Sequence, residues 1–582
     1  MRGFDVFMYR THLCGELRQA DIGREVRLSG WVESIRDHGG VKFMDLRDGS
    51  GVTQIVLHDD AMLRGVNREA VVSVAGSVRA RSEDTVNPKR YTGYIEVYAD
   101  SLDLLGACRN MLPFEIAESR QTREDVRLKY RYLDLRNPEI RRNIELRARV
   151  VSFLRARMER LGFLEIQTPI LTASSPEGAR DYLVPSRKHS GRFYALPQAP
   201  QQFKQLLMVA GFDKYYQIAP CFRDEDARGD RSPGEFYQLD FEMAFAEQED
   251  VLRVAEEVLF GVFRQFGEKR PASPPFPRIP YADAMLRYGT DKPDLRNPLV
   301  IRDLTGFFSD VEFPLFKGKP VRGITADCSG RPRSFFDASL KYALDVGMKG
   351  LGYVTLSDGQ LKGPIGKFLT DDKRRTLIEE QELREGETLF FICDAPGDVD
   401  RFSGEIRTWL GEKLGLIDES RYAFCFIVDF PMFGWNPETG GYEFTHNPFS
   451  MPQGGLDALN GENPERILAW QYDVVCNGVE LSSGAVRNHS PEIMKRAFEL
   501  AGYSEEELEQ KFGAMYTAFQ YGAPPHAGMA PGIDRMIMLL AGEDAIRDVI
   551  AFPLNGNAQD LMLGAPGEVT ARQLREANIR VL

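Results

Sequence analysis

The sequence predicts a multidomain α+β protein, in which a small N-terminal β-barrel precedes a larger domain built on an antiparallel sheet. Three observations predict this fold class. The chain has 582 residues, which is too long for one hydrophobic core. Short segments with a period of two follow one another between about residues 25 and 105. The remainder mixes helices and strands without the regular βαβ rhythm of a doubly wound parallel sheet.

The first part of the chain reads as short strands separated by turns rich in glycine and aspartate. Apolar and polar residues alternate in segments 26–32, 41–47, 52–57, 71–80 and 94–98, with turns at 37–40 and 48–51. Five strands of this kind are typical of a small closed barrel of the OB type. We therefore predict a barrel domain over residues 1–108.

The second part begins with a charged linker and a long amphipathic helix. This helix is predicted from about residue 138 to 161, and Gly162 ends it. Further on, the proline-rich segment 271–280 is stiff and extended, and the residues after it, to about 420, have their own alternation of strands and helices. We expect an inserted α/β domain at 286–420, which divides the antiparallel-sheet domain into segments 109–285 and 421–582.

Composition and cysteine usage exclude several classes of protein. Hydrophobic residues make up 43% and charged residues 27% of the chain, as in ordinary soluble proteins. The seven scattered cysteines form no Cys-x-x-Cys pair, which fits a reducing cytoplasm better than a disulfide framework or a thiolate zinc site. The N-terminus has no export segment, whether translation starts at Met1 or Met8, and Asp429 and Pro431 interrupt the most apolar stretch. We expect a cytoplasmic protein without a membrane partner.

The charge distribution gives a mixed signal about nucleic acids. A formal net charge of −13 argues against such a partner, yet residues 120–160 hold thirteen Arg or Lys against six Asp or Glu. Taken alone, this stretch favours a solvated helix face with ion pairs over a nucleic-acid surface.

The most informative stretch reads CFRDED at 221–226 and FYQLDFEM at 236–243, with Arg228 and Arg231 between them. Its second half alternates as a strand, with Leu239, Phe241 and Met243 on one face and Gln238, Asp240 and Glu242 on the other. Arginines at the mouth of a strand–loop–strand suit a polyphosphate ligand, because guanidinium groups bind phosphate oxygens bidentately. A hairpin with surface ion pairs is the alternative, but carboxylates and arginines facing one another on a short strand favour a functional site.

A second informative stretch is the glycine-rich turn at 528–532, which opens the apolar helix predicted from 533. Arg535 falls in the first turn of this helix. A cation there opposes the helix dipole unless it meets an anion. The combination therefore predicts an anion-binding site.

These two stretches resemble motifs 2 and 3 of the class II aminoacyl-tRNA synthetases, and GFLEIQTP at 162–169 is similar to motif 1, the dimer-forming element. SPEGARD at 175–181, QQFKQ at 201–205 and NGVE at 477–480 narrow the resemblance to the bacterial-type aspartyl-tRNA synthetases. It covers essentially the whole chain. It implies an ATP-dependent ligase that joins L-aspartate to tRNA through an aspartyl-adenylate, a homodimer, an anticodon-binding barrel and a GAD-type inserted domain.

The resemblance also implies roles for single residues. Catalytic residues would be Arg223, Glu480 and Arg535. Aspartate would be bound by Glu177, Gln201, Lys204, Arg223, His446 and Arg487, with Arg487 clamping the side-chain carboxylate and Gln201 and Glu177 holding the ammonium group. ATP would contact Arg223, Asp224, Glu225, Phe236, Glu480, Gly532, Ile533, Asp534 and Arg535, and Mg²⁺ would bind Asp473 and Glu480. The alternatives are a surface charge or helix cap for Lys204 and Asp473, and a structural salt bridge for Glu480 and Arg487.

In the barrel, Phe43 and Gln54 match the family's anticodon-binding positions, and Arg36 would add a phosphate or base-edge contact. Taken alone, Phe43 could equally belong to the barrel core. In this family a histidine at the position of His38, in place of leucine, accompanies enzymes that charge both tRNA(Asp) and tRNA(Asn). We therefore expect dual tRNA specificity, and an enzyme that charges tRNA(Asp) only is the alternative.

The chain departs from the family pattern at Ala199, where serine is common, and in the motif 2 loop, which is one residue longer and carries Ser232 in place of a glutamine expected near ATP. Residues 481–485 replace a run that is richer in glycine. None of these changes removes a charged catalytic residue.

Other functions compete with this assignment. They are an asparaginyl- or lysyl-tRNA synthetase, a tRNA-independent asparagine-forming enzyme and a non-catalytic RNA-binding paralogue. Arg487 with Lys204 favours an acidic substrate over lysine, and the barrel argues against an enzyme that works without tRNA. Retention of Arg223, Glu480 and Arg535 together argues against a non-catalytic protein.

Overall fold

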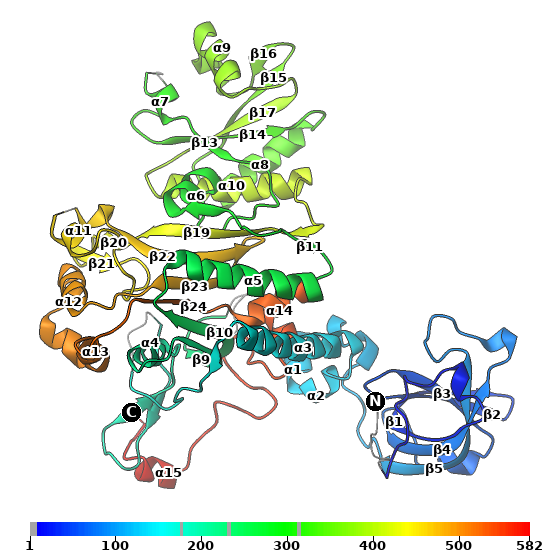
Figure 1. Cartoon of the computed structure of the whole chain (residues 1–582). Coiled ribbons are helices and arrows are strands. Elements are labelled where there is room, and N and C mark those ends of the chain that lie inside the picture. Colours follow the sequence, from blue (N-terminus) through cyan, green and yellow to red (C-terminus); the bar gives the residue numbers. More distant parts are fainter. Residues whose placement is uncertain are drawn as a thin grey trace. The chain divides into compact units, whose positions relative to one another are not determined.

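The computed structural model describes residues 8–174, 179–227, 229, 234–310, 313, 316–461 and 463–581. The chain separates into two compact units, Met1–Glu115 and Ile116–Leu582 (Figure 1). Each unit has hydrophobic cores of its own.

The first unit is a closed barrel with the strand order β1-β2-β3-β5-β4. Its strands are β1 (Glu25–His38), β2 (Val41–Arg47), β3 (Val52–Leu57), β4 (Val71–Ala80) and β5 (Ile95–Gly106). Strands β3 and β5 pair in parallel, and the other pairs are antiparallel. Leu28, Val32, Ile55 and Val74 point into the core, because alternate side chains of a strand share one face. The predicted barrel is confirmed.

Strand β5 is longer than the predicted segment 94–98. It pairs with β4 from Ile95 to Gly106 through two register shifts. Its second half is largely exposed, so the sequence there lacks the apolar alternation that marks a half-buried strand.

The second unit is built on a large sheet with the order β12-β19-β22-β23-β24-β10-β9-β6. Its strands are β6 (Leu164–Glu165), β9 (Lys214–Arg223), β10 (Gly234–Ala244), β12 (Arg278–Pro280), β19 (Phe424–Pro431), β22 (Leu468–Cys476), β23 (Val479–Val486) and β24 (His526–Met529). The central pairings of this sheet are antiparallel. Among its described strand pairs, only β12 with β19 and β6 with β9 run parallel. The predicted antiparallel sheet is confirmed.

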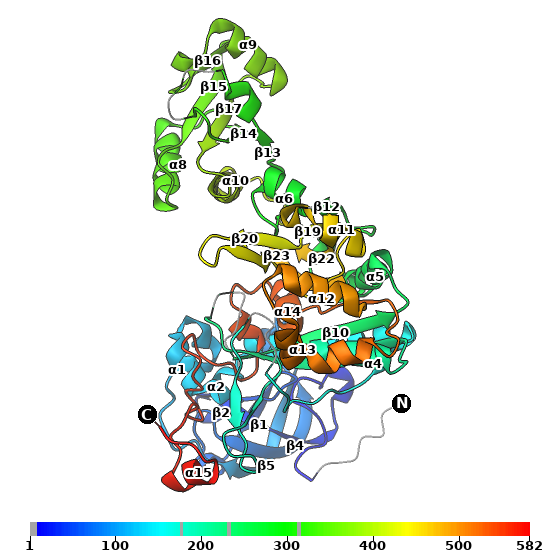
Figure 2. The ribbon, with the colours of Figure 1, turned by 90° about the vertical axis from the view of Figure 1, so that its left-hand side faces the viewer.

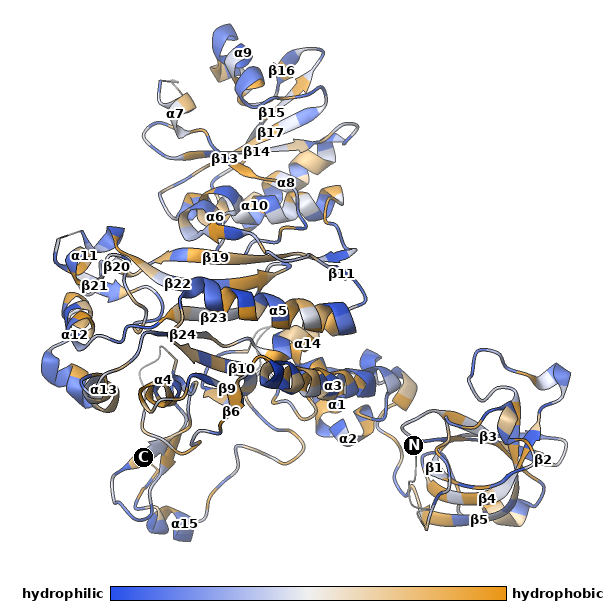
Figure 3. Ribbon diagram, in the orientation of Figure 1, coloured by the Kyte–Doolittle hydropathy of each residue, from blue (hydrophilic) through white to orange (hydrophobic). Residues whose placement is uncertain are grey.

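Helices α3 (Pro138–Arg160), α5 (Gln248–Phe266) and α14 (Ile533–Ala541) pack against this sheet in one shared core (Figures 1 and 3). The predicted long helix is α3. The side chain of Asn137 caps its first turn, and Gly162, at a φ of +83°, follows its last turn. Leu154 of α3, Val258 of α5 and Ile537 of α14 are buried together in this core.

A second helical layer gathers α4 (Gln201–Val209), α11 (Gly455–Gly461), α12 (Pro491–Leu500) and α13 (Glu505–Phe519), as Figure 2 shows. Its cores contain Phe449, Phe498 and Phe512 and, beside the hairpin of β20 (Phe433–Asn436) and β21 (Gly441–Phe444), Leu459. This layer holds α4 beside β9 and β10, so that α4 faces the edge of the pocket described below.

A separate sheet, with the order β13-β14-β17-β15-β16, is formed by chain that lies between β12 and β19. Its elements are α6 (Tyr281–Tyr288), β13 (Ile301–Asp303), α7 (Thr305–Phe308), β14 (Val321–Asp327), α8 (Arg333–Asp345), β15 (Gly352–Ser357), β16 (Gln360–Lys362), α9 (Asp371–Glu380), β17 (Glu387–Cys393) and α10 (Asp398–Leu414). Because β12 and β19 pair directly, the chain leaves and re-enters the large sheet at neighbouring positions.

Short elements complete the fold. They are α1 (Glu124–Lys129), α2 (Arg131–Asp134), α15 (Ala571–Glu576), β7 (Leu183–Pro185), β8 (Phe193–Ala195), β11 (Arg270–Pro271) and β18 (Arg421–Tyr422). None of the seven cysteines, all of which lie in the described ranges, forms a disulfide. Among the residues that the structure describes, no helix is long and apolar enough to cross a membrane.

Candidate active site

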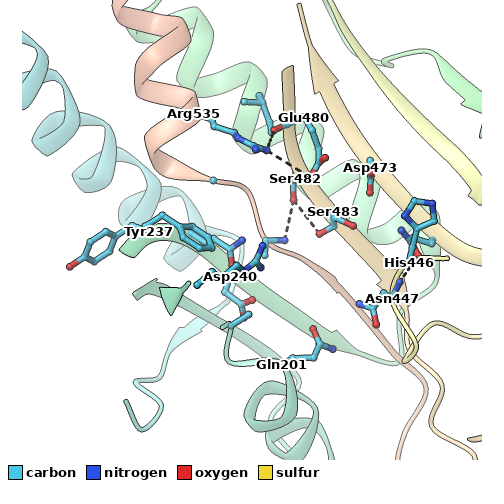
Figure 4. Close-up of a pocket in the computed structure, with 18 of the residues that line it drawn as sticks. Gln201, Tyr237, Asp240, His446, Asn447, Asp473, Glu480, Ser482, Ser483 and Arg535 are labelled. Carbon is cyan, nitrogen blue, oxygen red and sulfur yellow. Dashed lines mark hydrogen bonds and ion pairs between the residues drawn. The ribbon is translucent and has the colours of Figure 1, made fainter. Parts of the chain in front are cut away.

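A cavity of about 450 Å³ lies at the large sheet and is lined by residues of β9, β10, β22, β23, α4 and α14 (Figure 4). It gathers most of the residues singled out from the sequence. They are Gln201, Lys204, Arg223, Glu225, Phe236, His446, Asp473, Glu480, Arg487, Gly532, Asp534 and Arg535. Glu177 lies outside the described residues. The structure therefore brings together side chains from segments that are far apart in the sequence.

Arg487 lies at the closed end of the cavity and is almost fully buried. Its Nε donates to Glu242 Oε1 at 2.8 Å, and its Nη2 donates to Glu242 Oε2 at 3.3 Å. Its Nη1 has no hydrogen-bond partner among the described residues. Glu242 thus fixes the guanidinium plane and leaves Nη1, with its two N–H groups, for a carboxylate in the cavity.

Gly528 makes this arrangement possible. It lies on β24 opposite Glu242 of β10, and a Cβ at this position would stand 2.1 Å from Glu242 Oε2. Any side chain there would displace the carboxylate that orients Arg487. Gly528 therefore serves the close approach of two strands, whereas Gly532 is the residue that precedes the helix.

Lys204 supplies a second buried cation. Its Nζ donates to Asp240 Oδ2 at 2.7 Å and lies 3.5 Å from Glu242 Oε2. Asp240 is fully buried, and burial raises the pKa of its carboxyl group above its usual value, although Lys204 opposes the shift. Within the described ranges Asp240 Oδ1 has no hydrogen-bond partner, so this oxygen can accept from a ligand.

Arg223 and Phe236 lie at the opposite end of the cavity, near the mouth of the β9–β10 hairpin. The guanidinium carbon of Arg223 stands 4.9 Å from the centroid of the Phe236 ring. The guanidinium group thus lies over one face of the ring in a cation–π contact, and its charge suits a phosphate group in the cavity. Asp224, by contrast, is not among the lining residues, and its backbone N–H donates to the Arg180 carbonyl at 3.0 Å.

The first three residues of α14, which follow the glycine-rich turn, make different contacts. Arg535 Nη1 donates to the backbone carbonyl of Glu480 at 2.6 Å, which holds this cation over the cavity (Figure 4). Asp534 accepts from the backbone N–H of Tyr237 at 2.9 Å and pairs with Arg147, so it joins α14 to β10 and α3. The Ile533 side chain is buried in the main core. A ligand in the cavity could therefore contact only the backbone of Ile533.

Two carboxylates face the cavity from β22 and β23, where the hairpin turn at Asn477 and Gly478 has positive φ at both residues. Burial, reinforced by the charge of Glu480, raises the pKa of Asp473 well above its usual range. Lys292 Nζ lies 3.4 Å from Glu480 Oε2. In the described part of the chain, no cluster of three or more His, Cys, Asp or Glu suited to a metal ion is found. The two carboxylates nevertheless fit a hard cation, because Asp473 Oδ1 is buried without a described hydrogen-bond partner.

His446 borders the cavity near this carboxylate pair. Its ring packs edge-on against Phe430, with ring centroids 4.8 Å apart. Burial lowers the pKa of His446 below its usual value, so the ring is neutral at pH 7 and can offer one donor and one acceptor.

The four barrel residues lie together on β1, β2 and β3. Arg36 Nη2 donates to Asp45 Oδ1 at 3.1 Å and to Gln54 Oε1 at 3.3 Å. His38 and Phe43 make an edge-on contact with centroids 5.9 Å apart. Phe43 is half-buried and lies outside the core of the barrel, whereas Gln54 is almost fully buried. The alternative assignment of Phe43 to the barrel core is therefore not favoured.

Sequence reasoning assigned no individual role to several buried residues in or next to the cavity. Asp240 and Glu242 stood on the polar face of a predicted strand, which was the available signal for a buried polar pair. No sequence pattern marked Lys292 as a cavity residue, because it lies in the loop between α6 and β13. Gln205, on α4, and His526, at the start of β24, were also given no role, and both are fully buried polar residues.

Comparison with known proteins identifies the family of the chain. Residues 123–556 match the family described as "tRNA synthetases class II (D, K and N)", and residues 26–105 match the "OB-fold nucleic acid binding domain". The chain belongs to the class II tRNA synthetases, in the group that this description names.

Particular relatives are similar over nearly their whole length. An aspartate–tRNA ligase of Streptomyces coelicolor is 54% identical, with 98% of each chain aligned. An aspartate–tRNA(Asp/Asn) ligase of Zymomonas mobilis is also 54% identical, again over 98% of each chain. Among solved structures, asparaginyl-tRNA synthetase from Pyrococcus horikoshii complexed with asparaginyl-adenylate superposes with a TM-score of 0.58 at 18% identity. That match covers 94% of this chain and 98% of the other, and it bears on the fold alone.

Proposed function

We propose that this chain activates L-aspartate with ATP and transfers the aspartyl group to tRNA, as an aspartate–tRNA ligase. The observation that carries the proposal is the closed end of the cavity. There Arg487 Nη1 offers an unused buried donor, while Asp240 Oδ1 offers an unused buried acceptor, both judged within the described residues. An amino acid with an acidic side chain presents the complementary carboxylate and ammonium groups.

In this proposal, Arg487 and Lys204 bind the side-chain carboxylate, and His446 adds a donor. Gln201 and Asp240 accept from the ammonium group, and Glu177 joins them. The α-carboxylate of aspartate then attacks the α-phosphorus of ATP, an aspartyl-adenylate forms and pyrophosphate leaves. Arg223 stabilises the charge that develops on the α-phosphate. A ribose hydroxyl of the tRNA acceptor end attacks the acyl carbon next, and AMP leaves.

The adenine ring would lie between Phe236 and Arg535, where one residue stacks and the other makes a cation–π contact. Asp224, Glu225, Gly532, Ile533 and Asp534 would complete the nucleotide site, Asp224 and Ile533 by their backbone groups. Mg²⁺ would be held by Asp473 and Glu480 and would supply charge neutralisation at the phosphates.

The barrel would bind the anticodon through Arg36, His38, Phe43 and Gln54. We further propose that His38 permits aspartylation of both tRNA(Asp) and tRNA(Asn). The proposal extends to a cytoplasmic homodimer formed through residues 162–169. It also includes the division into residues 1–108, 109–285, 286–420 and 421–582.

Amino-acid-dependent ATP–pyrophosphate exchange tests the ligase activity. We expect exchange with L-aspartate and little exchange with asparagine or lysine, because Arg487 and Lys204 require an anionic side chain. Exchange that depends on asparagine or lysine instead would support the competing synthetases, and no exchange with any amino acid would support a non-catalytic paralogue.

Aminoacylation of purified tRNA(Asp) and tRNA(Asn) transcripts, compared side by side, tests the tRNA specificity. We expect aspartylation of both, and we expect His38→Leu to reduce charging of tRNA(Asn) selectively. Charging of tRNA(Asp) is the internal control for each preparation. Negligible aspartylation of tRNA(Asn) by the parent protein would favour the discriminating enzyme.

A further inference from the structure

Three buried polar side chains form a row that runs from the cavity into the interior. Gln201 and Gln205 lie one turn apart on the same face of α4, and His526 begins β24. Gln201 is 7% exposed, whereas Gln205 and His526 are fully buried. Gln201 Nε2 lies 3.0 Å from Gln205 Oε1, and Gln205 Nε2 lies 3.0 Å from His526 Nε2. Gln201 is the member of this row that lines the cavity, where Figure 4 shows it.

The last contact of the row determines where the protons lie. His526 Nδ1 is 2.8 Å from the backbone carbonyl oxygen of Pro524. A carbonyl oxygen only accepts, so Nδ1 carries a hydrogen. Burial lowers the pKa of His526 to about 4, and the ring is therefore neutral at pH 7. In a neutral imidazole with a hydrogen on Nδ1, Nε2 is an acceptor.

The orientation of both glutamine amides follows from this tautomer. Because His526 Nε2 accepts, the NH₂ group of Gln205 must point to it. The carbonyl oxygen of Gln205 then points to Gln201 and accepts from the NH₂ group of Gln201. The remaining terminal atom of Gln201, its Oε1, is left for the cavity, which Gln201 lines.

We propose that His526 and Gln205 are positioning residues that hold the Gln201 amide with its carbonyl oxygen toward the substrate, and so select an amino acid with a free α-ammonium group. This inference rests on the proposed function. With the opposite orientation, Gln201 would present N–H donors to the ammonium group, and one ammonium proton would lose its acceptor. Neither His526 nor Gln205 needs to touch the substrate to exert this effect.

The test compares aspartate with succinate, which has both carboxylates but lacks the α-ammonium group. The readout is the ratio of the Ki of succinate to the KM of aspartate in ATP–pyrophosphate exchange. Gln205→Met keeps the length of the side chain and removes its donor and acceptor. We expect this variant to lower the ratio by about tenfold, the loss of one hydrogen bond to a charged group, with the KM for ATP unchanged.

Gln205→Glu separates the two contacts of Gln205, because it keeps an oxygen that can accept from Gln201 but has no donor for His526 Nε2. We expect it to stay within about threefold of the parent ratio, which is less than a full hydrogen bond. His526→Asn is a second, independent perturbation. Asparagine can still donate to the Pro524 carbonyl but has no acceptor at the position of Nε2, so the ratio should fall as it does for Gln205→Met.

The outcomes separate two kinds of failure. If aspartate and succinate weaken equally in both Gln205→Met and His526→Asn, these residues only support the fold and the inference is overturned. An unchanged ratio in both variants overturns it as well. If the parent protein shows no aspartate-dependent exchange, the proposed function itself is refuted.

Discussion

Replacement of Arg487 by leucine removes the residue that the site depends on most. Arg487 and Glu242 are both buried and are joined by hydrogen bonds of 2.8 and 3.3 Å. Without the guanidinium group, the nearest cation to Glu242 is Lys204, whose Nζ lies 3.5 Å away and is already bound to Asp240. Breaking a buried ion pair by removing one partner costs about 3–5 kcal/mol. Because Lys204 compensates in part, we expect the free energy of unfolding to decrease by about 3 kcal/mol.

A double variant separates the loss of stability from the loss of function. Glu242→Gln in the Arg487→Leu background removes the uncompensated carboxylate, so the thermal midpoint should recover most of its decrease. Aspartate activation should not recover, because the clamp for the side-chain carboxylate is absent. Two charge-assisted hydrogen bonds at about 1.5 kcal/mol each predict a decrease of at least about 100-fold in kcat/KM for aspartate.

The measurements are thermal unfolding of the parent, single and double variants, and aspartate-dependent ATP–pyrophosphate exchange by each. Equal thermal midpoints for the parent and Arg487→Leu would refute the reasoning about the buried pair. A double variant that activates aspartate within about tenfold of the parent rate, too small a loss for two such bonds, would show that the carboxylate is bound elsewhere.

Three further predictions concern other parts of the molecule. Asp473→Asn removes one of two adjacent carboxylates, so it should raise the thermal midpoint and increase the Mg²⁺ concentration needed for half-maximal exchange; an unchanged Mg²⁺ requirement would place the cation elsewhere. His526 has a pKa lowered from 6.5 to about 4, so the unfolded chain takes up a proton first as pH falls. The stability that this histidine contributes is complete above pH 6.5 and decreases by about 2 kcal/mol between pH 6.5 and 5. Thermal unfolding at both pH values should therefore show a larger loss for the parent than for His526→Asn. Phe43→Ala should raise the KM for tRNA by about tenfold or more through lost base stacking and leave ATP–pyrophosphate exchange unchanged, whereas an equal loss in both assays would argue against an anticodon contact.

Most of the fold was predictable because its elements are defined by local patterns. Alternating residues predicted the barrel strands and the β9–β10 hairpin, and Gly162 predicted the end of the long helix. The outer half of β5 could not be predicted, since an exposed strand needs no apolar alternation and is held by its hydrogen bonds to β4.

The site was predictable where the chemistry of single residue types is distinctive, and not where it depends on long-range contacts. The sequence alone showed arginines next to turns that could bind an anion, and carboxylates on one face of a predicted strand. It did not show the partner of each. Glu242 and Arg487 are separated by 245 residues, and Gln205 and His526 by 321. A buried glutamine or histidine also has no periodic signature, because its burial depends on the partner that satisfies it.

The place where the inserted sheet joins the rest of the chain constrains how this protein can be shortened. Because β12 and β19 run parallel, a connection that replaced the excised segment would still have to cross from the end of β12 to the start of β19, which takes about a dozen residues or more. A deletion that began at residue 286 would also remove Lys292, the cation 3.4 Å from Glu480. The outgoing chain thus lines the cavity beside Glu480, and a minimal enzyme would have to keep that loop or supply its charge by another route.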